Sequence, residues 1–145
     1  NIIGMETLGL RMERVCNIAF RLAQALEKLE GVSVNYPLLE SSPYHELAEK
    51  QLSGKGGAIL TIRAGSKERA YKLINHLKYV KIATNIGDVR TLVIHPASTI
   101  YIHSTPEAMA EAGVYDDTIR ISVGIEDIKD LIQDFTEAVE SLGEE

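Results

Sequence analysis

A single arginine in the middle of a strand-like segment is the residue best placed to do chemistry. Residues 118–127 read TIRISVGIED, in which apolar and polar side chains alternate around Arg120 before a helical pattern begins. A period of two predicts a β-strand with Ile119 and Ile121 on one face and Arg120 on the other. A guanidinium fixed on a strand is a planar, two-pronged donor that matches a carboxylate or a phosphate. Arginine is also common on the solvent face of an edge strand, and the pattern alone favours that simpler interpretation.

The other residues of chemical interest give weaker signals. The glycine-rich run at 54–57 is not followed by the helix that a phosphate cradle needs, so we interpret it as a flexible turn. The four histidines have no metal-ligand spacing and no set of cysteines to join them. His95 ends an apolar strand-like segment, and we expect it to be structural. The sequence therefore predicts no metal site, and it contains no nucleophile elbow.

Composition limits the classes of function. The chain has 145 residues, 45% of them hydrophobic and 25% charged, which is typical of one soluble globular domain. Its net charge of −6 and the lack of a basic run argue against nucleic acid as a partner. No apolar run is long enough for a bilayer, no signal peptide is visible, and the single Cys16 fits a reducing compartment. We therefore expect a cytoplasmic protein, and the start at Asn1 suggests a fragment or a processed product.

A long helix is expected at residues 4–29, ahead of the elements that position Arg120. Its apolar residues recur at steps of three and four and form one stripe. The stripe consists of Met5, Leu8, Met12, Val15, Ala19, Leu22, Leu26 and Leu29. We expect both Met12 and Cys16 to be core residues. A domain of this size does not need so long a helix, so we expect part of it to pack against something else.

Short strands and helices alternate through the rest of the chain. The patterns predict strands at 32–35, 58–63, 80–83, 91–95 and around Arg120. They predict helices at 43–52, 66–77, 105–111 and 126–141, with Ser66 and Thr105 as N-caps. The expected fold class is α/β (α+β): a small mixed sheet with helices mainly on one face.

Three segments together resemble one enzyme family. They are GMETLGLRMER at 4–14, NIGDVRTLVIHPAST at 85–99 and IRISVGIED at 119–127. They look like the C-terminal part of the pyridoxal-phosphate enzymes of cysteine and methionine metabolism, and the resemblance spans nearly the whole chain. The HPAS and RISVGIE blocks are its most specific parts. Within the family, residues 85–88 and 93–96 are most similar to the O-acetylhomoserine sulfhydrylases.

The resemblance implies a fold-type-I architecture. A large upstream domain would bind pyridoxal phosphate, and residues 1–145 would form the C-terminal domain that closes over the substrate, with 4–29 as a connecting helix. Arg120 matches the family arginine that pairs with the α-carboxylate, which overturns the solvent-face interpretation. Thr91 matches a hydroxyl position on the family's active-site strand, close to substrate or cofactor. The family's Schiff-base lysine motif, phosphate-binding glycine segment and ring-stacking tyrosine have no match here, so no catalytic residue is expected and this chain alone should be inactive.

The implied activity of the whole protein is that of a pyridoxal-phosphate-dependent transferase. It would convert O-acetylhomoserine and sulfide to homocysteine and acetate. The implied partners are the protein's own N-terminal cofactor domain, a small amino-acid substrate, and further copies in a homodimer or homotetramer. Ile100-Tyr101 replaces a common Thr-His, and Val15 stands where many relatives have histidine. Neither position therefore points to a specific thiol acceptor or leaving group.

Several alternatives remain open. A methionine γ-lyase and a cystathionine γ-synthase or lyase belong to the same family. The chain could instead be a stand-alone amino-acid-binding module that uses Arg120. A third alternative is an interaction domain whose first-helix stripe drives dimer formation.

Overall fold

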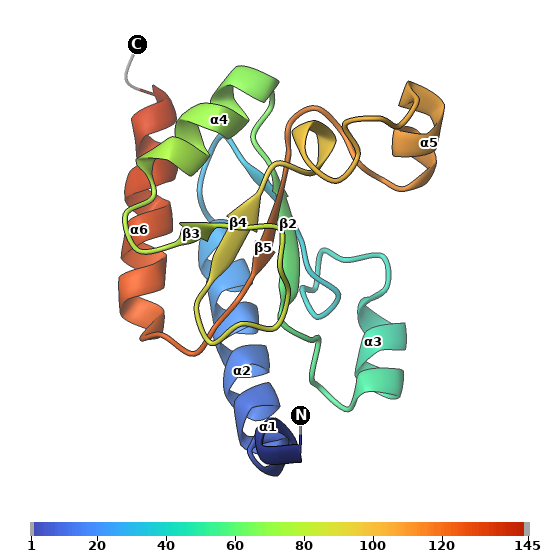
Figure 1. Cartoon of the computed structure of the whole chain (residues 1–145), viewed down its shortest axis with the longest axis vertical. Helices are drawn as coiled ribbons and strands as arrows, with labels where there is room; N and C mark the ends of the chain where they lie inside the picture. The colour runs from blue at the N-terminus through green and yellow to red at the C-terminus, as the bar shows by residue number, and fades with distance from the viewer. Residues whose placement is uncertain (1, 144–145) are drawn as a thin grey trace.

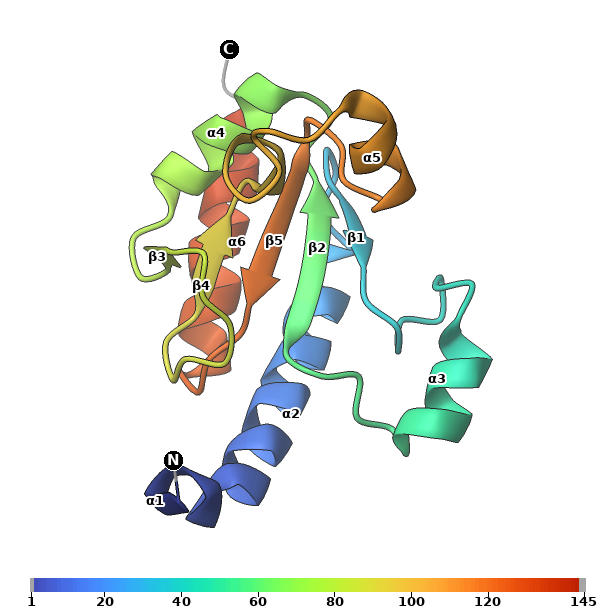
Figure 2. The same cartoon turned by 45° about the vertical axis from the view of Figure 1, so that its right-hand side comes forward.

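A five-stranded mixed sheet organises the protein, for which a computed structural model describes residues 2–143. Across the sheet the strands are β1 (Ser33–Asn35), β2 (Ile59–Arg63), β5 (Thr118–Ser122), β4 (Leu92–Ile94) and β3 (Lys81–Ile82). Neighbouring strands are antiparallel, except β3 and β4, which are parallel. The predicted small mixed sheet is confirmed. The strand that carries Arg120 is β5, which lies at the centre between β2 and β4 (Figure 2), so the edge-strand interpretation is wrong.

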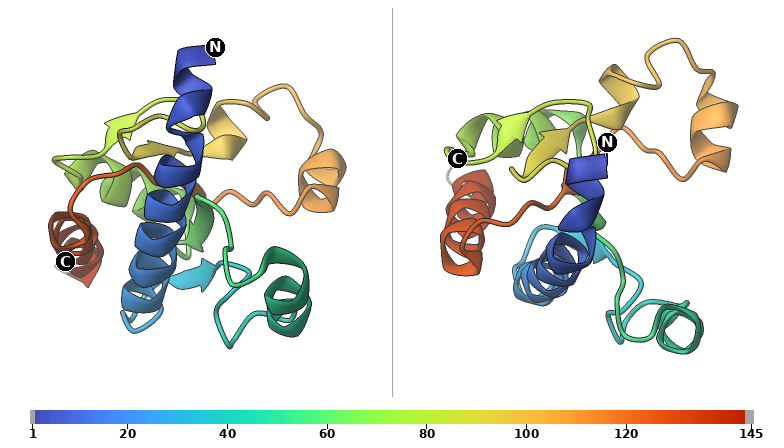
Figure 3. Two further views of the ribbon diagram at one scale, coloured as in Figure 1. Left: turned by 90° about the horizontal axis from the view of Figure 1, so that it is seen from below. Right: turned by 60° about the horizontal axis from the view of Figure 1, so that its bottom comes forward.

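Three helices cover one face of the sheet, as the sequence predicted. They are α2 (Leu8–Leu26), α4 (Lys67–His76) and α6 (Ile128–Glu140). In Figure 1, α4 and α6 lie to the left of the strands and α2 passes behind them. Ile119 and Ile121 of β5 are fully buried against this layer, where Phe135 of α6 is also fully buried. Two shorter helices, α3 (His45–Leu52) and α5 (Pro106–Glu111), stand away from the layer on the other side of the molecule (Figure 3). The α/β class is confirmed, and the opposite face of the sheet carries no helix layer among the residues described.

The N-terminal helix differs from the prediction in extent and in burial. It is divided at Thr7 into α1 (Ile2–Glu6) and α2, and it ends at Leu26 instead of residue 29. The stripe is buried only from Val15 onward, because the earlier part of the helix extends past the sheet (Figure 1). Cys16 is buried as predicted, but Met12 is 41% exposed, so its assignment to the core is wrong.

Capping residues fix the starts of α4 and α5. The Ser66 hydroxyl accepts a hydrogen bond from the Arg69 backbone N–H, and Thr105 accepts one from Ala108. Both predicted N-caps are therefore confirmed. The helix expected from residue 43 begins at His45. Short 3₁₀ turns follow β4 at Pro96–Ser98 and α6 at Ser141–Gly143.

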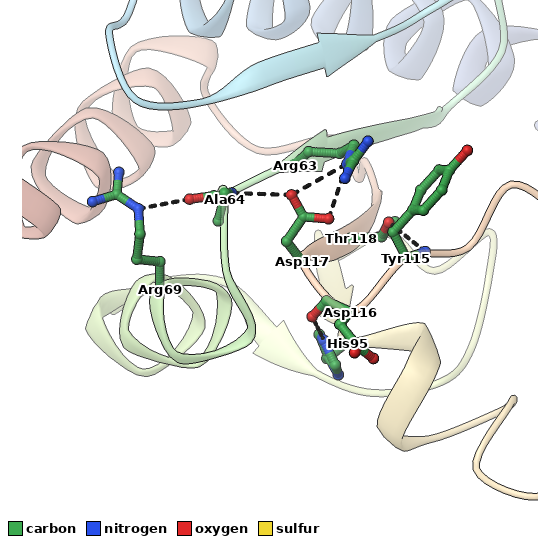
Figure 4. A network of polar contacts seen from close by, with 9 residues as sticks. Arg63, Ala64, Arg69, His95, Tyr115, Asp116, Asp117 and Thr118 are labelled. Carbon is green, nitrogen blue, oxygen red and sulfur yellow. Dashed lines mark hydrogen bonds and ion pairs between the residues drawn. The ribbon is translucent and has the colours of Figure 1, made fainter. Parts of the chain in front are cut away.

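A polar network fixes the turn that leads into β5 (Figure 4). The buried Asp117 accepts hydrogen bonds from Arg63 Nε at 2.9 Å and from the Gly65 backbone N–H at 3.0 Å. His95 Nε2 lies 2.6 Å from the carbonyl oxygen of Asp116. Because a carbonyl only accepts, Nε2 carries the proton of this bond. The network holds the start of the strand on which Arg120 lies, and His95 has the structural contacts that the sequence predicted.

Candidate functional site

Arg120 lies on the sheet face that the helices leave open. It pairs with Thr61 of β2 and Ile94 of β4, and its side chain points away from the apolar core because its neighbours Ile119 and Ile121 point into it. Its Nη2 donates to the carbonyl oxygens of Thr84 at 3.0 Å and Asn85 at 3.4 Å. One terminal nitrogen of the guanidinium is thus held by the protein backbone.

The Nε atom of Arg120 is buried and has no hydrogen-bond partner. It is the single buried side-chain nitrogen or oxygen without a partner among residues 2–143. A buried donor left unpaired costs about 1–3 kcal/mol, so such an atom in a native protein calls for an explanation. Within the same residues Arg120 also forms no ion pair. A carboxylate ligand would satisfy both the unpaired donor and the uncompensated charge.

The loop between β3 and β4 carries the groups that hold Arg120. Thr84 and Asn85 lie in this loop, and further along it the Gly87 backbone N–H donates to Ser122 Oγ at 3.3 Å. Ser122 is two residues beyond Arg120 and faces the same side of the sheet. Sequence reasoning missed Thr84 and Asn85 because they act through backbone carbonyls, which leave no signature in residue type. Only the alternation along β5 could have pointed to Ser122.

Thr91 lies on the other side of the sheet from Arg120. Two residues along, Val93 pairs with Ile121, and both are in the core beneath the helices, so Thr91 faces the same way. Its hydroxyl donates to Glu126 Oε2 at 2.8 Å and accepts from the Gly124 N–H at 3.0 Å. The structure therefore does not bring Thr91 and Arg120 together. A direct contact of Thr91 with substrate or cofactor stays a prediction.

The remaining candidates do not extend the site. Residues 54–57 form an irregular turn after α3 that is exposed at Gly54 and Lys55 and half-buried at Gly56 and Gly57, and Gly54 and Gly57 have positive φ, which agrees with the turn interpretation. In the part of the chain that the structure describes, no three His, Cys, Asp or Glu side chains cluster closely enough to hold a metal ion. None of the helices in that part is long and apolar enough to cross a membrane.

The residues present fit a substrate's carboxylate better than they fit the cofactor. All eight lysines are exposed, whereas a lysine that forms a Schiff base is usually enclosed and desolvated. Arg120, by contrast, offers a buried, unpaired donor on a backbone-held guanidinium. The described residues therefore supply a group that could hold a substrate's carboxylate, and none of their lysines is enclosed by this chain.

Comparison with known proteins agrees with the sequence resemblance. The chain is 48% identical to a homocysteine synthase of Schizosaccharomyces pombe, with 94% of this chain covering 32% of that protein. It is 44% identical to O-acetyl-L-homoserine sulfhydrylase 1 of Thermus thermophilus (95% and 33% covered) and 41% identical to an L-methionine gamma-lyase of Treponema denticola (96% and 35% covered). The chain thus spans about a third of the length of the curated relatives it matches.

A solved structure and a family model lead to the same family. The structure is a Campylobacter jejuni protein assigned as an O-acetylhomoserine (thiol)-lyase, which contains N'-pyridoxyl-lysine-5'-monophosphate. It superposes with a TM-score of 0.91 at 35% identity, over 94% of this chain and 33% of its own. The family model described as Cys/Met metabolism PLP-dependent enzyme matches residues 2–140. The chain therefore belongs to the family of PLP-dependent enzymes of cysteine and methionine metabolism.

Proposed function

We propose that this chain is the C-terminal, substrate-closing part of a PLP-dependent O-acetylhomoserine sulfhydrylase. The whole protein would act as a transferase that converts O-acetylhomoserine and sulfide to homocysteine and acetate. The observation that carries the proposal is the unpaired, buried Nε of Arg120 on a guanidinium whose Nη2 is bound to the loop carbonyls of Thr84 and Asn85. The relatives named homocysteine synthase and O-acetyl-L-homoserine sulfhydrylase 1 support the choice of substrate.

In this proposal Arg120 binds and orients the amino-acid substrate. Its Nε and the adjacent Nη2, which share one edge of the guanidinium, donate to the α-carboxylate in a two-point contact, which fixes the direction of the α-proton toward the cofactor. Pyridoxal phosphate, when bound, supplies the electron sink for the chemistry at the substrate's carbon atoms. The chain's own contribution is therefore substrate positioning, and the catalytic lysine would come from the cofactor domain.

The exposed apolar residues before Val15 support a connecting role for the N-terminal helix. Ile3 is 82% exposed, Met5 67% and Leu10 75%, which is a large apolar area for a helix that faces water. We propose that the cofactor domain of the same protein covers them, with residues 1–145 as one domain and residues 4–29 as its connecting segment. A second copy in a homodimer or homotetramer is the alternative partner. A contact through Leu22 is ruled out, because that residue is fully buried in its own domain.

The test compares three variants of the full-length protein. Removing a charged hydrogen-bond partner costs about 1.5–3 kcal/mol, so Arg120→Ala should raise KM for O-acetylhomoserine about 10- to 100-fold and lower kcat/KM. Arg120→Lys should recover only part of the loss, because an ammonium cannot make the two-point contact. Arg21→Ala, which removes an exposed arginine of α2, is the matched control and should change neither constant. An unchanged kcat/KM in Arg120→Ala would refute the proposed role.

A γ-lyase activity is the second candidate, because the L-methionine gamma-lyase relative is nearly as similar as the sulfhydrylase. Incubating the full-length protein with O-acetylhomoserine plus sulfide, with methionine and with cystathionine separates the two. The sulfhydrylase proposal predicts the highest kcat/KM for the first pair. Release of 2-oxobutyrate from methionine at a higher kcat/KM would favour the lyase.

A further inference from the structure

The loop that holds Arg120 contains no helix or strand between β3 and β4. Residues 84–90 are mostly exposed, and the two carbonyls that bind Nη2 lie at the start of this stretch. A carbonyl can orient a guanidinium only if the loop itself has a fixed shape. The direction in which Arg120 points therefore depends on whatever fixes the loop.

The segment that follows β5 fixes the far end of this loop. Both carboxylate oxygens of Glu126 accept a hydrogen bond from Thr91. The Thr91 N–H donates to Oε1 at 2.5 Å, and the Thr91 hydroxyl donates to Oε2 at 2.8 Å. The same hydroxyl accepts from the Gly124 N–H at 3.0 Å, and the Ile125 N–H donates to the Val89 carbonyl at 2.9 Å. These bonds attach the end of the loop to the segment directly after β5. Because β5 also carries Arg120, the loop is bound to the same strand segment at both of its ends.

The contact between Thr91 and Glu126 leaves little freedom to either side chain. The Thr91 hydroxyl uses its one proton toward Glu126 and a lone pair toward Gly124, so it is engaged both as donor and as acceptor. Glu126 accepts two hydrogen bonds from one residue, a task that needs two acceptor oxygens and therefore a carboxylate. A glutamine in its place would turn one acceptor into a donor that faces another donor.

We infer that Glu126 and Thr91 are positioning residues that set the direction of Arg120 through the loop at 84–91, without touching the substrate themselves. The inference rests on the proposed function, because it assumes that Arg120 binds the carboxylate. It also gives Thr91 a task that suits its place on the helix side of the sheet. The loop's backbone carbonyls transmit the effect of Glu126 to Arg120.

The test uses the full-length protein and its two substrates, only one of which has a carboxylate. Glu126→Gln and Thr91→Val should each raise KM for O-acetylhomoserine about 10-fold while leaving KM for sulfide unchanged. Thr91→Ser keeps the hydroxyl and should restore the wild-type KM. Glu140→Gln changes an exposed glutamate of α6 in the same way and is the matched control, with no change expected. Crystal structures of Glu126→Gln and the wild type should show Arg120 Nη2 displaced from the Thr84 carbonyl in the variant alone.

The outcomes separate this inference from the function on which it rests. If Arg120→Ala raises KM for the amino acid but Glu126→Gln and Thr91→Val do not, the positioning role is wrong and the proposed function stands. If Arg120→Ala also leaves KM unchanged, the proposed function itself fails. If the Glu126 and Thr91 variants raise KM for both substrates equally, or Thr91→Ser fails to restore the wild-type value, the effect is general damage and the inference is overturned.

Discussion

Gly124 gives the sharpest test of the packing behind Arg120. A Cβ atom added to this glycine would lie 2.3 Å from the Val89 carbonyl oxygen, 2.6 Å from the Arg90 carbonyl carbon and 2.6 Å from Glu126 Oε2. Two of these three atoms belong to the backbone, so they cannot rotate away as the end of a side chain can. The change Gly124→Ala must therefore push the 84–91 loop away from the segment after β5.

The expected cost follows from the size of the clash. The shortest contact falls roughly an ångström short of an ordinary van der Waals distance, and overpacking of this kind costs about 1–3 kcal/mol. Gly124 does not have a positive φ, so the cost is steric and contains no term for backbone conformation. For a chain of this length each kcal/mol lowers Tm by about 2–4 °C, so a cost of about 1–3 kcal/mol predicts a decrease of about 2–12 °C.

The assay compares Gly124→Ala with the same substitution elsewhere in the chain. Gly9 lies on an exposed part of α2, and a Cβ added there would have no atom within 4 Å, so Gly9→Ala should leave stability unchanged or raise it by up to about 1 kcal/mol. Thermal unfolding followed by circular dichroism gives both Tm values. Hydrogen exchange at the Ile125 N–H, which donates to the Val89 carbonyl, should also become faster in Gly124→Ala. Equal Tm values for the two variants would refute the close packing around Gly124.

Two further predictions concern α6. Asp134 is buried and accepts hydrogen bonds from the backbone N–H groups of Lys78 at 2.9 Å and Tyr79 at 3.1 Å. Asp134→Ala leaves both donors unpaired, so it should lower the free energy of unfolding, measured by urea denaturation, by about 2–4 kcal/mol. A loss below about 0.5 kcal/mol would contradict this. The hydrogen bond from Lys78 Nζ lowers the pKa of Glu137 below its usual range, so folding favours the ionised carboxylate. The contribution of this carboxylate to the free energy of unfolding is therefore fully present above its unfolded pKa of about 4.3, and it is lost as pH falls through the lower folded pKa. The stability difference between wild type and Glu137→Gln should therefore shrink between about pH 6 and pH 3, and a constant difference over that range would show that the pair does not titrate as described.

Local sequence patterns determined most of the secondary structure. The alternation in TIRIS specified a strand with Arg120 opposite Ile119 and Ile121, and this is the arrangement in β5. Ser66 and Thr105 marked the starts of α4 and α5, because an N-cap needs only a side-chain oxygen and the next three residues. These features depend on neighbours within one turn or one strand, so the chain's own order of residues contains them.

Features that depend on distant parts of the chain were not readable in this way. The stripe of the first helix looked uniform, yet Leu22 is buried and Met12 is 41% exposed, because only the tertiary fold decides how far the sheet extends along α2. The alternation around Arg120 by itself favoured an edge strand, whereas the pairing of β5 with β2 and β4 makes it a central one.

The setting of Arg120 was decided by pairing and backbone geometry. Its central position in the sheet came from β2 and β4, which are distant in sequence. Its partners are the carbonyls of Thr84 and Asn85, which every residue type possesses, and so no sequence pattern could have named them. The sequence by itself thus determined which residue carries the charge. The tertiary structure alone decided what holds that charge and which of its donors is left for a ligand, because both depend on atoms brought together across dozens of residues.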